Sequence, residues 1–190
     1  MEFKDLVKKR RTIRRFTQDS ITIDTLKSLI EYARLAPSAA NIQSLRYIIV
    51  KDSYVCKKVF PLVRWAANLP EDERAPEEDR RPTAYIIVLN DIDIKKGAKY
   101  DIGAAVQNIL LGAADEGLGA CWMGSIERDK LRILFSVPDK YEITHVISLG
   151  YPDEKSEIEP FEGSYKYWKD ENGTMHVPKL SIEELIFKIE

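Results

Sequence analysis

The chain has 190 residues, of which 44% are hydrophobic, and its net charge is -2, from 29 Lys and Arg against 31 Asp and Glu. That length predicts a single domain over residues 1–190, and the near balance of charge argues against a nucleic-acid partner, which would need a basic excess. The charged N-terminus is followed by no apolar run long enough for a signal peptide or a membrane span. We therefore predict a cytoplasmic protein with no membrane partner.

The N-terminal quarter of the chain predicts two helices and a strand. Apolar side chains recur at helical spacing over residues 3–7, and this short helix leads into a cluster of basic residues at 10–16. Thr22 has the character of an N-cap, and the amphipathic helix that it begins should end before Pro37. A small polar loop follows, and the run at 45–50 predicts a strand.

A charged segment bounded by prolines interrupts this pattern at residues 70–82. Its composition favours a solvated and mobile surface segment, and a lid over a site is the sharper alternative. The uninterrupted apolar, β-branched run at 85–89 then predicts a strand that is covered on both faces.

Residues 101–117 predict a central helix. Apolar residues recur at helical spacing, but small and apolar residues also occupy most of the remaining helix surface. Such a helix must be buried on nearly all sides, and its small residues let another backbone approach closely. In a chain of this length the pattern favours a homodimer in which a second subunit covers part of the helix. Packing within one core is the alternative.

The C-terminal part of the chain adds further strands and helices. A Gly-bounded apolar stretch at 117–125 predicts a strand and a turn, an amphipathic helix follows at 127–136, and another strand at 143–149. Ser181 and Glu184 have the spacing of a capping box, so a C-terminal helix should begin there. Strands that alternate with helices predict an α/β fold, or an α+β fold with a mixed sheet.

Conventional catalytic and metal-binding motifs are missing from the sequence. The pattern around His145 favours a core or sheet position, whereas His176 is expected at the surface. Cys56 and Cys121 are expected to be reduced and buried rather than nucleophilic. We therefore predict no catalytic side chain and no metal ligand. If the protein is an enzyme, a cofactor carries the reaction and the chain binds and orients it.

Five stretches resemble the flavin-dependent nitroreductase family. Arg10–Phe16 resembles its R-R-S-x-R-x-F opening, and Ala36–Gln43 resembles its A-P-S-x-x-N-x-Q loop. Gly117–Gly124 is similar to its G-L-G-x-x-W-x-G stretch, and Leu149–Pro152 to the L-G-Y-P that follows. His176–Lys179 resembles a C-terminal V-P-K-R found in one branch. The matches occur in the family's order and span nearly the whole chain, so together they are specific.

The resemblance implies an α+β fold, with helices around a mixed central sheet and a long buried central helix, in an interlocked homodimer that binds FMN between its subunits. Arg10, Thr12 and Lys179 would hold the FMN phosphate. Arg11 would lie at the phosphate or ribityl chain, and Arg14 near the pyrimidine edge of the ring. A loop of the other subunit and the stretch after the central helix would supply the remaining contacts, namely Pro37, Ser38, Ala39, Asn41, Gln43, Trp122, Met123 and Gly124.

The implied reaction passes a hydride from NADH or NADPH to flavin N5, and then electrons to an electron-poor acceptor such as a nitroaromatic, a quinone or an activated alkene. No sequence feature selects between NADH and NADPH. Reductive dehalogenation, consumption of FMN as a substrate, and flavin storage or sensing without turnover are alternatives within the same fold. The N-terminal arginines could instead bind RNA or another phosphate-rich partner, which the net charge disfavours.

Overall fold

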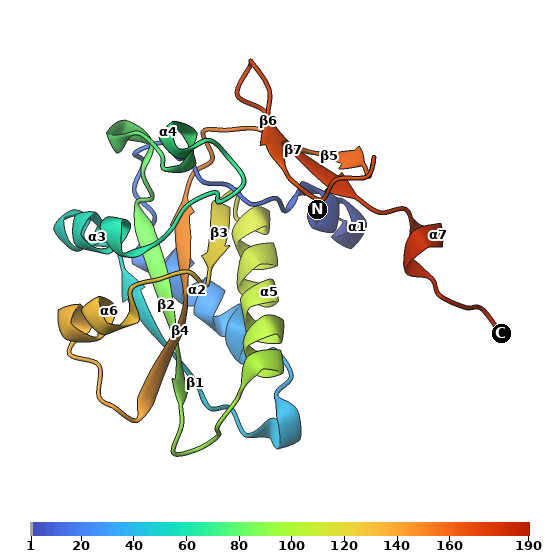
Figure 1. Ribbon diagram of the computed structural model, residues 1–190. Helices are drawn as coiled ribbons and strands as arrows, with labels where there is room; N and C mark the ends of the chain where they lie inside the picture. Colours follow the sequence, from blue (N-terminus) through green and yellow to red (C-terminus); the bar gives the residue numbers. More distant parts are fainter. Residues whose placement is uncertain (1) are drawn as a thin grey trace.

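A four-stranded antiparallel sheet forms the centre of the computed structural model, which describes residues 2–190 (Figure 1). Its strand order is β1 (Leu45–Val50), β2 (Ala84–Asp91), β4 (Tyr141–Gly150) and β3 (Gly119–Met123). Every residue of β2 is buried, as expected for a central strand covered on both faces. The predicted strands at 45–50, 85–89 and 143–149 are confirmed within these bounds.

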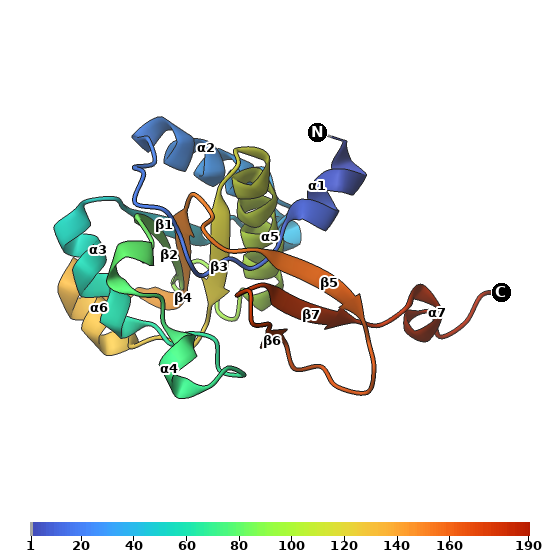
Figure 2. The same ribbon diagram turned by 90° about the horizontal axis from the view of Figure 1, so that it is seen from above.

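Two pairs of helices cover the two faces of the sheet (Figure 2). On one face, α2 (Ile23–Arg34) and α5 (Lys99–Asp115) enclose an apolar core with alternate residues of β2 and β4. On the other face, α3 (Ser53–Val59) and α6 (Arg128–Phe135) enclose a second core. The α+β prediction is confirmed, with parallel pairing confined to a bridge at the edge of β3 and to the C-terminal sheet.

The helices begin and end where local chemistry places them. The Thr22 side chain accepts a hydrogen bond from the backbone N–H of Thr25, which confirms the predicted N-cap of α2.

The Tyr32 ring of α2 packs directly on Gly112 of α5, where any side chain would collide with it. The small residues of α5 therefore admit a neighbouring helix of the same chain.

The N-terminal segment lies along the edge of the sheet. After α1 (Phe3–Lys9), Thr12 forms a parallel bridge with Ala120 of β3, and the N–H of Ile13 donates to the Ala120 carbonyl at 3.0 Å. Phe16 is fully buried, and a Cβ on Gly150 would lie only 2.7 Å from its side chain. The absence of a side chain at that glycine therefore lets the segment approach the sheet.

Ion pairs connect the charged segment at residues 70–82 to the neighbouring parts of the chain, and its position at the surface agrees with the prediction of a solvated segment. It contains two short helices, α4 (Glu71–Arg74) and η3 (Glu78–Arg80), and Arg80 pairs with Asp153 at 2.6 Å. Most of its side chains are exposed, as its composition predicts.

The C-terminal arm, residues 156–190, projects away from the rest of the molecule (Figures 1 and 2). It contains a small sheet in the order β5 (Ser156–Pro160), β7 (Met175–Lys179) and β6 (Trp168–Lys169). The predicted capping box is present at the start of α7 (Ile182–Leu185). The sequence did not predict this sheet, α3 or the short turns η1 (Ala39–Asn41) and η2 (Phe60–Leu62). Within residues 2–190, no helix combines the length and the apolar character needed to cross a membrane.

Candidate functional site

Arg10 and Arg11 place two guanidinium groups at the end of α1 without carboxylate partners. Both side chains are half-buried, and among residues 2–190 neither has an ion pair. Arg11 Nε donates instead to the Arg10 carbonyl at 2.7 Å. Loss of solvent lowers the pKa of both groups, and the neighbouring Arg10 charge lowers that of Arg11 further. Two desolvated cations side by side are a favourable place for an anion.

Arg14 extends this basic surface along β3. Its guanidinium lies 4.8 Å from the centre of the Tyr167 ring, and its Nε is buried with no hydrogen-bond partner among the described residues. Tyr167 belongs to the C-terminal arm and had no place in the sequence prediction. Thr12 lies between these cations, beside Ala120.

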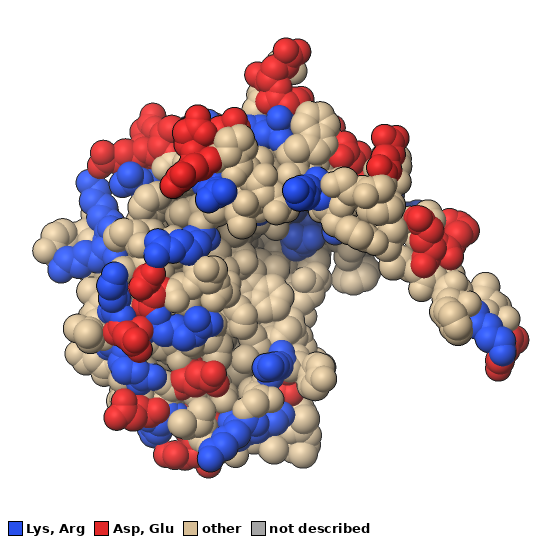
Figure 3. Space-filling model, in the orientation of Figure 1, with Lys and Arg blue, Asp and Glu red and all other residues tan. Residues whose placement is uncertain are grey.

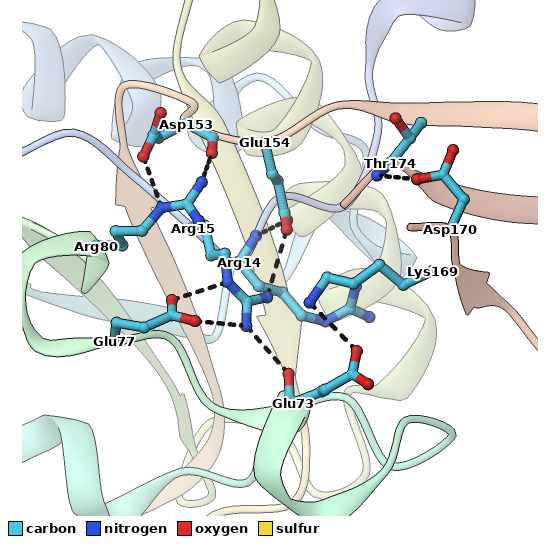
Figure 4. Close-up of polar contacts among 10 residues, drawn as sticks. All are labelled: Arg14, Arg15, Glu73, Glu77, Arg80, Asp153, Glu154, Lys169, Asp170 and Thr174. Atoms are coloured by element: carbon cyan, nitrogen blue, oxygen red, sulfur yellow. Dashed lines mark hydrogen bonds and ion pairs between the residues drawn. The ribbon is translucent and has the colours of Figure 1, made fainter. Parts of the chain in front are cut away.

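Arg15 differs from the other arginines of the cluster because it is a structural residue (Figure 4). Its side chain is 3% exposed, and it pairs with Glu77 at 2.9 Å and with the buried Glu154 at 3.7 Å. It also donates to the Glu73 carbonyl at 3.1 Å. The basic cluster therefore divides into one arginine that holds the fold and three that have no counter-charge.

Trp122 presents an aromatic surface at the end of β3. Its side chain is 41% exposed on the sheet face that Ala120 shares, whereas Cys121 and Met123 point into the core on the opposite face. Met123 can therefore reach this surface only through its backbone. Gly124 follows at an exposed position. Figure 3 shows a hollow between the body and the C-terminal arm, with basic side chains at its rim.

His145 lies beside Trp122, with their ring centres 5.1 Å apart. A Cβ on Gly124 would lie 3.4 Å from its Nε2, so the imidazole lies against the turn after β3. Its Nδ1 is buried without a partner among the described residues, and desolvation together with the Arg128 charge lowers its pKa. The sequence predicted a core or sheet histidine. It gave no sign of this proximity, which follows from the pairing of β3 with β4: Trp122 lies opposite Ile147, two residues from His145 on the same strand.

The loop from Pro37 to Gln43 lies at the other end of α5. The N–H of Ala39 donates to Asp101 at 3.1 Å, and the N–H of Gln43 donates to Ser38 Oγ at 3.3 Å. Three residues adopt positive φ, namely Ala40, Asn41 and Gln43. Backbone held in this region is typical of ligand-binding loops.

The structure does not bring this loop and the arginines together within one chain. Asp101 lies in the first turn of α5, whereas Ala120 follows its C-terminal end. A helix of 17 residues spans about 26 Å at 1.5 Å per residue. Within one chain, the two groups therefore lie at opposite ends of α5.

Lys179 ends β7, on the side of the molecule that carries α1 (Figure 1). Its side chain is exposed and forms no ion pair within residues 2–190. Both cysteines are buried free thiols, and desolvation raises the pKa of Cys121. In the same part of the chain, no group of three or more His, Cys, Asp and Glu side chains could hold a metal ion.

The sequence matches a known protein family and known relatives. The family model described as the nitroreductase family matches residues 7–151. A protein of Archaeoglobus fulgidus, whose name couples NADH dehydrogenase with NAD(P)H nitroreductase, is 33% identical over 156 residues, covering 77% of this chain and 83% of its own.

Solved structures share the fold. A nitroreductase family protein of Streptococcus pneumoniae has a TM-score of 0.72 at 19% identity, over 99% of this chain and 100% of its own. An FMN-dependent nitroreductase of Clostridium difficile has a TM-score of 0.64 at 24% identity, over 80% of this chain and 88% of its own. The family model covers most of the chain, and residues 7–151 include the basic cluster and Trp122. The chain therefore belongs to the nitroreductase family.

Proposed function

We propose that this protein is an FMN-dependent oxidoreductase that takes electrons from NADH or NADPH. One observation carries the proposal: three arginines without counter-charges flank Thr12, which pairs with Ala120 in the same edge strand that carries the exposed Trp122. A phosphorylated isoalloxazine requires these two features together, a cationic group for its phosphate and an apolar surface for its ring. The FMN-dependent relative from Clostridium difficile has the same fold.

The residues present fit this cofactor. Arg10 and Arg11 are desolvated cations that an anion would compensate, and Thr12 offers a hydroxyl between them and Arg14. The buried Nε of Arg14 has no acceptor, which a polar edge of the flavin ring would supply. Lys179 would approach the phosphate from the C-terminal arm.

The flavin supplies two-electron chemistry when it is bound, passing hydride equivalents from the nicotinamide to an electron-poor acceptor such as a nitroaromatic or a quinone. Trp122 and the Met123–Gly124 backbone would hold the ring, and Arg14 would keep a positive charge near its polar edge. That charge favours the anionic reduced cofactor. We further propose that residues 1–190 form one domain and that the protein acts in the cytoplasm.

We also propose that the active unit is a homodimer, because the site is incomplete in one chain. Pro37, Ser38, Ala39, Asn41 and Gln43 would contact the ring bound by the other subunit. One side of α5 supports this arrangement: its small residues are only partly covered, and a Cβ on Gly103 would meet no atom within 4 Å. A second subunit would cover that surface.

The C-terminal arm supplies the second argument for a dimer. Five large apolar side chains are exposed in its last nine residues, namely Ile182, Leu185, Ile186, Phe187 and Ile189. A cavity of about 480 Å³ between α2 and β1 is lined by apolar residues that include Ile30, Ala33, Leu45, Tyr47 and Ile49, and by charged residues such as Lys27 and Arg46. Pro37, Ser38 and Gln43 of the flavin-contacting loop also belong to this lining. The arm points away from its own body, so we propose that this cavity receives the arm of the second copy.

The cofactor proposal is tested on the purified protein and one matched pair of variants. We expect a yellow protein with a flavin absorption band that consumes NAD(P)H steadily when an acceptor is added. Arg10→Ala should lose FMN at least about tenfold more readily, while the unfolding transition of the FMN-free protein is unchanged. Lys9→Ala removes a nearby exposed cation and should retain FMN normally.

Two results would count against the proposal. A colourless protein that ignores added FMN would exclude the cofactor, and normal FMN retention in Arg10→Ala would exclude the phosphate assignment. Flavin bound without NAD(P)H consumption would favour storage or sensing, and oxygen-dependent loss of bound flavin after reduction would favour its consumption as a substrate.

A further inference from the structure

A second cavity, separate from the N-terminal arginines, lies between α3 and the beginning of β2. Its volume is about 180 Å³, and the residues that line it include Cys56, Phe60, Arg81, Thr83 and Tyr85. One water molecule takes about 30 Å³ of liquid, so the space exceeds that of a single buried water. Tyr85 belongs to the core on the α3 face of the sheet, whereas Trp122 lies on the opposite face.

Three polar atoms in the lining are buried and have no hydrogen-bond partner among the described residues: Arg81 Nε, Thr83 Oγ1 and Tyr85 Oη. Tyr85 is 0% exposed, so its hydroxyl cannot turn to bulk water. The large majority of buried side-chain polar atoms in proteins have a hydrogen-bond partner, so three such atoms without one around a single cavity require an explanation. All three atoms can donate a hydrogen bond, which points to an acceptor-rich occupant.

Arg81 is the one charged lining residue of the cavity that is partly buried. The Arg81 guanidinium lies over the Phe60 ring at 4.1 Å from its centre, rather than against a carboxylate. Lys51 and Lys57 also line the cavity, and both are exposed. Glu78 is the one acidic lining residue, and it pairs with Lys57 at 3.5 Å on the exposed rim. An occupant would therefore meet a net positive field.

The remaining titratable groups of the cavity are neutral. Burial raises the pKa of the Tyr85 phenol, and it raises the pKa of the Cys56 thiol to about 11. The phenol therefore stays a donor at ordinary pH and does not repel an anion. The Cys56 thiol lies against the Thr83 carbonyl at 3.6 Å.

We propose that this cavity binds a small oxyanion, either phosphate or the phosphoryl group of a small ester, through Arg81, Thr83 and Tyr85. The three donors supply hydrogen bonds to its oxygens, and the two lysines provide charge at the entrance. The site lies on the opposite face of the sheet from Trp122, so its ligand is distinct from the cofactor proposed above.

The FMN-saturated protein is titrated with inorganic phosphate and, separately, with glycerol phosphate, at constant ionic strength, while the heat of binding is measured. Saturation with FMN covers the N-terminal arginines. If FMN does not bind, Arg10→Ala serves as the parent protein instead. We expect one saturable site for phosphate. Binding of glycerol phosphate at the same site assigns a phosphoryl group as ligand, and its failure to bind assigns free phosphate.

The variants locate the site. Arg81→Gln should weaken phosphate binding at least about tenfold and Tyr85→Phe about fivefold, as expected for loss of a charged and a neutral donor. The Phe variant keeps the buried ring, so it tests the hydroxyl without opening the core. Arg64→Gln removes an exposed arginine that pairs with Glu127 at 2.6 Å, and it should bind phosphate as the parent does.

Three results would overturn the proposal. They are the absence of saturable binding, equal phosphate affinity in Arg81→Gln and the parent, and a site abolished by Arg10→Ala but kept in Arg81→Gln. Crystals soaked in selenate give an independent reading, because an anomalous peak between Arg81 and Tyr85 is expected and its absence counts against the site.

Discussion

Apolar side chains are mostly buried in the body of the molecule, residues 2–155, and mostly exposed in the C-terminal arm, residues 156–190. In the body, apolar side chains fill two cores on the two faces of one sheet. In the arm, Met175 is the one apolar side chain that is buried. Phe16 of the body is 0% exposed, whereas Phe187 of the arm is 101% exposed.

The two histidines repeat this contrast. His145 in the body is held beside Trp122, and the Arg128 charge acts on it more strongly than that of Glu142. His176 in the arm stacks on Trp168 at 4.3 Å and has the carboxylates of Glu159 and Asp170 at 3.5 and 3.3 Å. The body is thus stabilised by its own apolar contacts. The arm is attached to it through a small cluster of Met175 with Ala66 and Leu69, and leaves the apolar side chains of its last nine residues for another surface.

The largest expected effect is a loss of stability in the body. Phe16→Ala should lower the free energy of unfolding by about 3–5 kcal/mol, because it removes a fully buried ring and detaches the N-terminal segment from Gly150. Chemical denaturation measures the change. A loss below about 1 kcal/mol would mean that the segment is not part of the folded body, since surface substitutions rarely exceed that value.

The next effect concerns the junction where the arm leaves the body. Arg15→Gln should cost about 3 kcal/mol of unfolding free energy, because Glu154, 2% exposed, would keep a buried charge without its cation. Arg34→Gln is the matched control, since its pair with Glu31 is exposed and should contribute less than about 1 kcal/mol. Equal effects in the two variants would contradict a buried role for Arg15.

The body was largely predictable from the sequence because its signals are local. The apolar run at 85–89 and the N-cap at Thr22 each depend on neighbouring residues, and the structure confirms both. In the arm, the one local signal, the capping box at Ser181, is confirmed as well. The burial of both cysteines is likewise confirmed. The β5–β7–β6 sheet was missed because its strands are short and depend on pairing between distant segments.

The residue types of the candidate site were predictable from the sequence. Which of its arginines form structural ion pairs and which stay unpaired was not. Arg14 and Arg15 are neighbours in a basic run, and no local pattern tells which one meets Glu77 and Glu154. That assignment depends on segments more than sixty residues away. The position of His145 beside Trp122 depends in the same way on the register between strands.

The third prediction tests whether the arm depends on a second copy. Phe187→Ala should weaken the dimer at least about tenfold, because a fully exposed ring can contribute only where another surface covers it. Sedimentation over a range of concentrations gives the dissociation constant. Ile133→Ala is the control, since this residue is 80% exposed on α6, outside the arm and the cavity beneath α2. An unchanged dimer in Phe187→Ala would remove the arm from the interface.

The smallest expected effect is the contribution of His145 to the pH dependence of the unfolding free energy. Desolvation, with a further contribution from Arg128 that exceeds the opposing effect of Glu142, lowers the pKa of His145 below its ordinary value of about 6.5. The unfolded chain therefore binds a proton that the folded chain does not, so stability is highest above about pH 6.5 and falls as pH drops through the folded pKa. His145→Asn removes the titrating group. Unfolding free energies measured from about pH 5 to pH 8 should give a wild-type curve that falls more steeply at low pH than that of the variant. Parallel curves would show that the imidazole reaches solvent when it is charged, and that its neighbourhood in the body is as open as that of the arm.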